Sequence, residues 1–272
     1  MHIVLNDGRK IPQLGLGLWQ TPSGVTAEIV AAALTTGYRH LDTAAVYGNE
    51  GGVGPGIEAA GIPREDVFVT TKVWNDAQGF DSTMRACRDS LSRLRLDYVD
   101  LYLVHWPAPR LNRYVETWRA LIRLREEGFT KSIGVSNFGA EHIERIVGET
   151  GVPPAINQIE LHPRFQQHKL QEIHKAHSIA TESWAPLGRT QSLDDPVIAE
   201  IAAKHGRTPA QIVIRWHLDE GLVVIPKTAR RERLGENFDV FGFTLDAEDR
   251  AAIAALDRSD GRIGPDPMTV AF

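Results

Sequence analysis

Eight short apolar segments alternate with amphipathic helical segments along most of this chain of 272 residues. Each apolar segment has the length of a strand, and each helical segment is long enough to return the chain to the same end of a sheet. Eight such units predict an α/β fold of the closed (β/α)₈ TIM-barrel type. The predicted strands are 14–17, 39–42, 67–72, 98–104, 130–135, 155–160, 179–184 and 222–226.

The segments between these elements are short and contain no low-complexity stretch or block of like charge. We therefore expect one domain over residues 1–272, a length that suits a barrel of about 250 residues. The run IVLNDGRKIP, with a turn signal at Asp7-Gly8, predicts an N-terminal β-hairpin. Additional loops are expected near 106–113 and 185–197, and the last dozen residues, GRIGPDPMTVAF, should form a surface tail. Helices are expected to end at Gly37, Gly128 and Gly221.

The composition is that of an ordinary globular protein, with 42% hydrophobic and 24% charged residues. No apolar run approaches the roughly 20 residues of a membrane span, and the start MHIVLNDGRK lacks a signal-peptide pattern. We expect a cytoplasmic protein without membrane contact. A net charge of −5 gives no long-range attraction to nucleic acid. The single cysteine, Cys87, is expected to be a packed helix residue.

Three predicted strands end in a polar residue that can take part in proton transfer. Asp42 closes YRHLD, Lys72 closes VFVTTK, and His105 closes YVDLYLVH. Because parallel strands end at the same side of a barrel, these side chains should gather there, and Tyr47 should join them from the loop after Asp42. Taken singly, each residue also fits an ion pair or a packed histidine, so the prediction depends on their joint placement.

A doubly wound dinucleotide fold is the alternative to a barrel, because Gly15-Leu16-Gly17 and the later Asp42 imitate its fingerprint. Gln20 stands at the third glycine position. Thr21-Pro22 also separates the glycines from the next helix. These differences favour the barrel.

Seven runs of the sequence occur in an order and spacing that resemble one known family. They are LGLGLW, GYRHLDTAAVYGNE, VTTKVWN, DYVDLYLVHWP, SIGVSNF, NQIELHP and IPKTARRERLGEN. The chain resembles the aldo-keto reductases over essentially its whole length, and it is most similar to the bacterial 2,5-diketo-D-gluconate reductases. The resemblance implies a barrel with short active-site loops and the NADPH-dependent reduction of a small aldehyde, ketone or keto-sugar acid.

The resemblance also implies roles for the four clustered residues. Tyr47 would donate the proton that the new alkoxide needs, and His105 would orient the substrate carbonyl. Lys72 would lower the pKa of the Tyr47 phenol toward neutrality, while Asp42 would keep the ammonium charged. Three tryptophans that follow predicted strands would line the substrate pocket: Trp19, Trp74 and Trp106.

Further residues are implied in binding NADPH. Ser136, Asn137 and Gln158 would hold the nicotinamide carboxamide, and Trp184 would stack on its ring where many relatives have tyrosine. The following loop would contribute Pro186, Leu187 and Gly188. Basic residues beside a helix N-terminus suit the 2′-phosphate, and the implied set there is Lys227, Thr228, Arg230, Arg233, Glu236 and Asn237. Thr228 replaces the usual serine and Gly235 the usual glutamate. Arg231 is interpreted as a solvated side chain, and His162 as a structural residue. A monomer is implied.

Two other functions remain as alternatives. His40 and Asp42 are two residues apart and share one face of a strand, as two ligands of a metal-dependent barrel hydrolase would. No HxH pair or matching carboxylate–histidine set appears at the other strand ends, so no metal is expected. A nicotinamide-sensing subunit without turnover is the second alternative, but no partner-binding stripe favours it.

Overall fold

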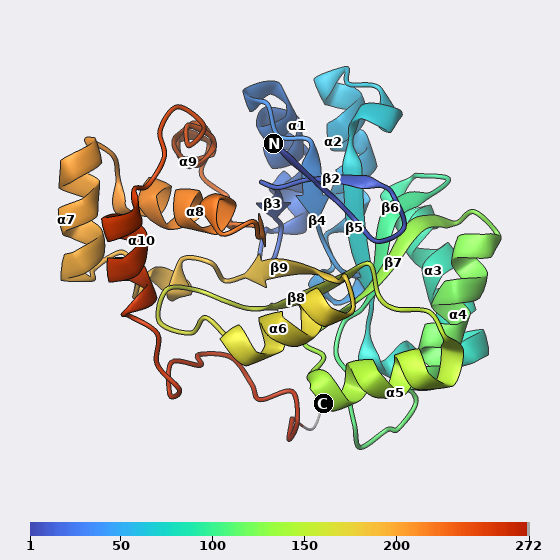
Figure 1. The fold of residues 1–272 in the computed structure, drawn as a ribbon. Coiled ribbons are helices and arrows are strands. Elements are labelled where there is room, and N and C mark those ends of the chain that lie inside the picture. Colours follow the sequence, from blue (N-terminus) through green and yellow to red (C-terminus); the bar gives the residue numbers. More distant parts are fainter. Residues whose placement is uncertain (271–272) are drawn as a thin grey trace.

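Eight parallel strands form a barrel at the centre of the protein (Figure 1) in the computed structural model, which describes residues 1–270. Neighbours in the barrel are also neighbours in the chain order of strands. Every predicted strand is present, and its ends differ from the prediction by at most two residues. The strands are β3 (Leu16–Gly17), β4 (His40–Asp42), β5 (Phe68–Val73), β6 (Val99–Val104), β7 (Thr130–Ser136), β8 (Ile156–Glu160), β9 (Ala180–Trp184) and β10 (Val223–Val224).

The first and last strands close the barrel through single bridges rather than a long ladder. Leu14 pairs with Val224, and Gly17 pairs with Lys227. The backbone N–H of Gly17 donates to Pro226 O at 3.2 Å. A Cβ atom on Gly17 would lie 2.9 Å from the Ile225 carbonyl oxygen, so this close approach requires glycine. The prediction of a closed (β/α)₈ barrel is confirmed.

Helices connect successive strands and surround the barrel (Figure 1). Three of them end as predicted, because Gly37, Gly128 and Gly221 follow helices with φ of 127°, 85° and 73°. The helices are α1 (Ser23–Thr36), α2 (Val53–Ala60), α3 (Phe80–Leu94), α4 (Tyr114–Glu126), α5 (Ala140–Thr150), α6 (His168–Ala176), α7 (Pro196–His205), α8 (Pro209–Asp219), α9 (Arg231–Phe238) and α10 (Ala247–Ala254). None within residues 1–270 is both long and apolar enough to cross a membrane.

The predicted hairpin consists of β1 (His2–Val4) and β2 (Lys10–Pro12), which pair in antiparallel fashion. It is attached at the N-terminal ends of the barrel strands, where Asn6 Nδ2 donates to Pro154 O at 2.7 Å. Leu5 and Ile11 are buried in an apolar cluster with residues of the barrel strands. The hairpin therefore occupies the end of the barrel opposite to the predicted site.

The C-terminal tail lies across the ends of β8 and β9. The backbone N–H groups of Ile263 and Gly264 donate to the Glu160 carboxylate at 2.6 and 2.8 Å. A Cβ atom on Gly264 would lie 2.5 Å from Trp184, so the tail passes close to that indole. Ala271 and Phe272 of the predicted tail lie outside the described residues.

Cys87 is buried in α3, as predicted. Burial raises the pKa of its thiol to about 12. The side chain therefore stays a thiol at neutral pH and contributes to packing.

Candidate active site

Asp42 and Lys72 form an ion pair where β4 and β5 lie side by side. Lys72 Nζ lies 2.6 Å from Asp42 Oδ1 and donates a second hydrogen bond to Thr43 O at 2.9 Å. Burial alone would lower the pKa of Lys72, but the negative charge of Asp42 and the hydrogen bond that Lys72 donates to it outweigh burial and raise the pKa. The ammonium is therefore charged and fixed in direction.

Tyr47 lies at the end of a single 3₁₀ turn, Ala45–Tyr47, which follows β4. Two buried residues after it anchor this loop. Asn49 Nδ2 donates to Leu18 O at 2.8 Å, and Glu50 accepts hydrogen bonds from Thr71 Oγ1 at 2.6 Å and from Arg93 Nε at 2.7 Å. Local sequence patterns did not assign these anchoring roles, although Asn49-Glu50 closes the quoted run GYRHLDTAAVYGNE.

The Tyr47 ring lies beside both Lys72 and His105. Lys72 Nζ is 5.2 Å from the ring centroid, and the His105 ring centroid is 5.6 Å away in an edge-to-face arrangement. The expected net fall in the pKa of Tyr47 is wrong. Burial raises its pKa, and the charge of Lys72 with its hydrogen bond opposes only part of that rise. Tyr47 therefore remains a protonated phenol at neutral pH.

His105 follows β6 directly and is packed between two aromatic rings. The Trp74 ring centroid lies 5.0 Å from that of His105, and Trp74 directly follows β5, the strand that holds Lys72. Burial, aided by the positive charge of Lys72, lowers the pKa of His105 well below its usual value. The imidazole is therefore neutral and can donate one N–H to an oxygen atom.

Gln158 connects the ion pair to a carboxyl group that the sequence analysis did not identify. Its Nε2 donates to Asp42 Oδ2 at 2.9 Å and to Glu182 Oε2 at 3.1 Å. Glu182 lies on β9 and is completely buried. In the run IATESW it is a charged residue inside an otherwise buried strand, and this is the signal that could have identified it.

Asn137 links three parts of the predicted nicotinamide site. Its Nδ2 donates to His105 O and to Ser136 Oγ, both at 3.0 Å, and its Oδ1 accepts from Trp184 Nε1 at 2.8 Å. The residue has a left-handed φ of 63°, which asparagine adopts more readily than most residues. The structure thus brings Ser136, Asn137, Gln158 and Trp184 together around the ends of β7, β8 and β9.

The loop after β9 has an irregular backbone. Ala185, Gly188, Arg189 and Thr190 all have positive φ. Pro186 and Gly188 are buried and Leu187 is half-buried, and a Cβ atom on Gly188 would lie 2.7 Å from Ser192 Oγ. The predicted cofactor residues of this loop are therefore held beside Trp184.

The predicted phosphate-binding segment leaves β10 and enters α9. Lys227, Arg230 and Arg233 are exposed, and none has a carboxylate partner within residues 1–270. Thr228 Oγ1 accepts from the Arg230 N–H at 3.1 Å, which shapes the turn into the helix. Arg231 is exposed, as a solvated side chain would be, and it pairs with Glu28 at 2.9 Å on the surface.

The remaining two residues of that set lie farther along α9. Glu236 Oε1 accepts from Thr208 Oγ1 at 2.8 Å, and Asn237 is buried. The structure therefore separates the exposed cations at the start of α9 from Glu236 and Asn237 farther along the helix.

The three predicted substrate-pocket tryptophans differ in their surroundings. Trp106 is buried, Trp74 is half-buried, and 43% of Trp19 is exposed. The Arg189 guanidinium lies 5.6 Å from the Trp19 ring centroid, so the loop after β9 contacts the loop after β3. Trp19 is thus connected to the loop after β9, whereas Trp74 and Trp106 follow β5 and β6.

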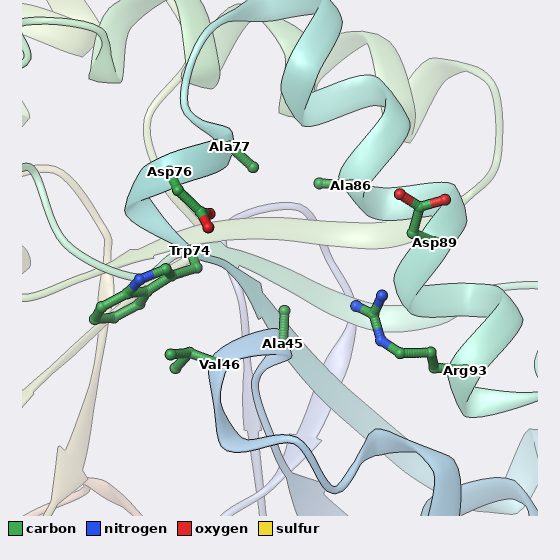
Figure 2. Close-up of a pocket in the computed structure, with 8 residues that line it drawn as sticks. All are labelled: Ala45, Val46, Trp74, Asp76, Ala77, Ala86, Asp89 and Arg93. Carbon is green, nitrogen blue, oxygen red and sulfur yellow. The ribbon is translucent and has the colours of Figure 1, made fainter.

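A cavity of about 590 Å³ opens beside the Tyr47 loop (Figure 2). Val46 and Trp74 lie on one side of it, whereas Asp89 and Arg93 approach from α3. Trp74 therefore borders this cavity on one side and His105 on the other. Tyr47 itself does not line the cavity, so this space adjoins the proton-transfer cluster without containing it.

The residues present fit an NADPH molecule at two points. The exposed cations at the start of α9 lack protein partners within the described chain, as a phosphate site requires. Gln158 directs its amide nitrogen to two carboxyl groups, which leaves its amide oxygen available to accept a hydrogen bond. Among residues 1–270, no group of three or more His, Cys, Asp or Glu side chains is arranged to hold a metal ion.

Comparisons with known proteins relate this chain to one family over most of its length. The family model described as "Aldo/keto reductase family" matches residues 13–258. Methylglyoxal reductase DkgA of Escherichia coli (strain K12) is 52% identical over 267 residues, covering 97% of this chain and 96% of that protein. A crystal structure of a Gox0644 variant in complex with NADPH is 56% identical, with a TM-score of 0.97 over 100% of this chain and 99% of that one.

A third comparison concerns the branch to which the sequence runs were most similar. A structure described as a putative 2,5-diketo-D-gluconic acid reductase B is 39% identical, with a TM-score of 0.93 over 97% of this chain and 94% of that one. The family model and these full-length similarities exclude the doubly wound fold and the metal-dependent hydrolase. With its Asp42, Tyr47, Lys72 and His105 gathered at the C-terminal end of a closed barrel, this chain belongs to the aldo/keto reductase family.

Proposed function

We propose that this aldo/keto reductase uses NADPH to reduce small aldehydes and ketones, with Tyr47 as the proton donor and His105 as the residue that orients the carbonyl. The observation that carries this proposal is the cluster around Lys72, whose Nζ lies 2.6 Å from Asp42 and 5.2 Å from the Tyr47 ring centroid. NADPH supplies the hydride when it is bound.

The chain's own residues account for the proton. Tyr47 is protonated at neutral pH because burial raises its pKa. An alkoxide is much more basic than a phenolate, so proton transfer from Tyr47 to the product oxygen is favourable. Lys72 remains beside the phenolate that is left and stabilises its negative charge. His105 is neutral, so its N–H donates to the carbonyl oxygen without a competing proton transfer.

The cofactor residues divide into two groups in this proposal. Ser136, Asn137, Gln158 and Trp184 would hold the nicotinamide, and the loop residues Pro186, Leu187 and Gly188 would cover the adjoining phosphates. Lys227, Thr228, Arg230 and Arg233 would bind the 2′-phosphate, with Glu236 and Asn237 toward the adenine. Supporting this division, Lys227, Arg230 and Arg233 are exposed and lack carboxylate partners in the described chain.

Small polar carbonyl compounds are the substrates that we propose. Trp19, Trp74 and Trp106 would line an apolar pocket in which His105 supplies a polar contact. The similarity to a methylglyoxal reductase and to a putative 2,5-diketo-D-gluconic acid reductase supports dicarbonyls and keto-sugar acids. We further propose that the protein works in the cytoplasm as a monomer and that residues 1–272 form one domain, because all predicted site residues come from one barrel.

The decisive experiment is a panel of carbonyl compounds with NADPH oxidation followed by absorbance. Methylglyoxal, a keto-sugar acid and simple aldehydes should support many turnovers per enzyme molecule. If every compound yields at most one oxidised cofactor per enzyme, the protein is a nicotinamide-binding subunit rather than a reductase. Gel filtration with light scattering tests the monomer.

A further inference from the structure

Glu182 is a buried carboxyl group at the centre of the barrel to which the reaction described above assigns no role. It lies on β9 directly beside Gln158 of β8, with which it is paired in register. Its Oε2 accepts one hydrogen bond, from Gln158 Nε2 at 3.1 Å. Its Oε1 has no hydrogen-bond partner within residues 1–270. A carboxylate with one amide donor and no contact with water is costly to bury.

Neither of the two basic side chains near Glu182 can serve as its cationic partner. His40 Nε2 lies 3.7 Å from Glu182 Oε1, but burial, together with the charge of Lys72, lowers the pKa of His40 to about 3. His40 is therefore neutral and cannot serve as a cationic partner. Lys72 already forms a 2.6 Å ion pair with Asp42. The groups that interact with Glu182 from the surrounding elements are Gln158, His40, Asp42, Lys72 and Tyr47.

We propose that Glu182 is a positioning residue of this reductase that retains a proton in the barrel core and thereby keeps the charges around Tyr47 balanced. With a neutral Glu182, the cluster contains one cation, Lys72, and one anion, Asp42. An ionised Glu182 would add a second negative charge to the same enclosed space. This inference rests on the proposed role of Tyr47.

Glu182 also helps to fix the orientation of the Gln158 side-chain amide. Because Gln158 Nε2 donates to both Asp42 and Glu182, the amide is held in one of its two orientations. Its oxygen is then directed away from both carboxyl groups, as an acceptor for the nicotinamide carboxamide must be. Replacing Glu182 with a residue that has no acceptor would release one side of this constraint.

The charge balance predicts a change with pH. Burial, reinforced by the negative charge of Asp42, raises the pKa of Glu182 to about 8. Above that pH the new carboxylate makes Tyr47 harder to ionise, since its charge raises the pKa of the phenol. Tyr47 then becomes a weaker acid, and reduction should slow. Below that pH Glu182 is neutral and the reaction should proceed at its full rate.

The test compares wild type with Glu182→Gln, which imitates the protonated carboxyl group. Single-turnover NADPH oxidation with methylglyoxal is measured across this pH range. The wild-type rate should fall by roughly threefold to tenfold as pH rises through about 8, the effect of about one pKa unit in the acidity of Tyr47. The Glu182→Gln rate should match wild type at lower pH and lack this fall. An unchanged fall in Glu182→Gln overturns the proposal.

A matched control is Asp100→Asn. Burial also raises the pKa of Asp100, but this carboxyl group, which lies on β6, pairs with Arg64 at 2.7 Å rather than with the Tyr47 cluster. Asp100→Asn should retain the wild-type pH profile. If it abolishes the fall instead, the fall does not come from Glu182 and the proposal is overturned.

A readout without catalysis separates this proposal from the proposed function. Infrared titration of the cofactor-free protein should show the carbonyl band of a protonated carboxyl group that disappears near the pKa of Glu182. This band should be absent from Glu182→Gln and present in Asp100→Asn. Its absence from wild type at neutral pH overturns the Glu182 proposal. A wild-type protein that shows the band but reduces no carbonyl compound would refute the proposed function alone.

Discussion

Trp184 and Asn137, which are 47 residues apart in the chain, are joined by a hydrogen bond of 2.8 Å from the indole Nε1 to the amide Oδ1. Asn137 uses its Nδ2 for two more hydrogen bonds, to His105 O and to Ser136 Oγ. All the hydrogen-bonding groups of the Asn137 side chain therefore have protein partners. Asn137 therefore orients the Trp184 side chain. Any contact between Asn137 and the nicotinamide must share or replace one of these hydrogen bonds.

We expect Trp184→Phe to lower the free energy of unfolding and to weaken the binding of NADPH. The substitution keeps an aromatic face but leaves the buried Asn137 Oδ1 without its donor, a loss of about 1–3 kcal/mol. Urea denaturation and NADPH titration measure the two effects. Trp19→Phe is the control, because Trp19 is 43% exposed and its replacement should change stability by no more than about 0.5 kcal/mol. Equal losses in both variants would refute the role of the hydrogen bond.

Tyr47→Phe should fold and bind NADPH nearly as wild type does, because the ring and its contacts with Lys72 and His105 remain. Carbonyl reduction should fall by roughly 10²–10⁴, the range for the loss of a positioned general acid. Turnover assays and NADPH fluorescence titrations on the same preparation measure both. A folded Tyr47→Phe with nearly normal turnover would remove Tyr47 from the mechanism.

Arg233→Ala should weaken NADPH much more than NADH, since only NADPH carries the 2′-phosphate. One charge-assisted hydrogen bond is worth about 1.5–3 kcal/mol, or roughly 10–150-fold in the dissociation constant. Titration of both cofactors into both proteins measures the difference. Arg231→Ala is a matched control, because Arg231 pairs with Glu28 at 2.9 Å and should not discriminate between the cofactors. Equal losses for NADPH and NADH in Arg233→Ala would contradict the phosphate assignment.

Glu182→Gln should stabilise the protein increasingly as pH rises above about 4.5. An unfolded glutamate titrates near 4.5, whereas burial raises the native pKa of Glu182 to about 8. Between these values the native state holds a proton that the unfolded state has lost, so wild-type stability falls by about 1.4 kcal/mol per pH unit from this group. The stability difference between the two proteins should widen across that interval and then level off. Urea denaturation at several pH values measures it, and a difference that is constant with pH would show that Glu182 is ionised in the native state.

Removal of metal ions should leave carbonyl reduction unchanged, because Tyr47 and His105 already supply the proton and the contact to the carbonyl oxygen. Turnover is measured before and after dialysis against a chelator, with re-addition of zinc or manganese as the control. Activity that depends on either ion would contradict this mechanism.

The sequence predicted the barrel and the clustered residues well because both depend on local patterns. The C-terminal ends of the strands of a parallel barrel lie on one side. The positions of Asp42, Lys72 and His105 at strand ends were therefore sufficient to predict that their side chains gather there. Burial was harder to predict than position. The pKa of Tyr47 is set by how deeply the loop packs, and that depth depends on Asn49 and Glu50, whose partners lie 21 to 43 residues away.

Glu182 shows the same limit more strongly. Its partner Gln158 and the more distant His40 are far from it in the sequence, and strand periodicity predicts only that it faces one side of β9. Whether that side holds water, a cation or another acid follows from the closure of the whole barrel. The bond between Trp184 and Asn137 is likewise a consequence of the left-handed backbone at Asn137, which the residue type permits without requiring.

The seam between β3 and β10 consists of two isolated bridges rather than a continuous ladder, and β10 itself contains only Val223–Val224. Lys227 takes part in one of its two bridges and also begins the segment that we assign to the 2′-phosphate. A cofactor held there ties the ends of the sheet together as well as occupying the site. The amide hydrogens of Gly15, Gly17 and Val224 should therefore exchange with deuterium more slowly once NADPH is bound. Under the proposed phosphate assignment, closure of the ring of strands and binding of the nucleotide are coupled equilibria, so each favours the other.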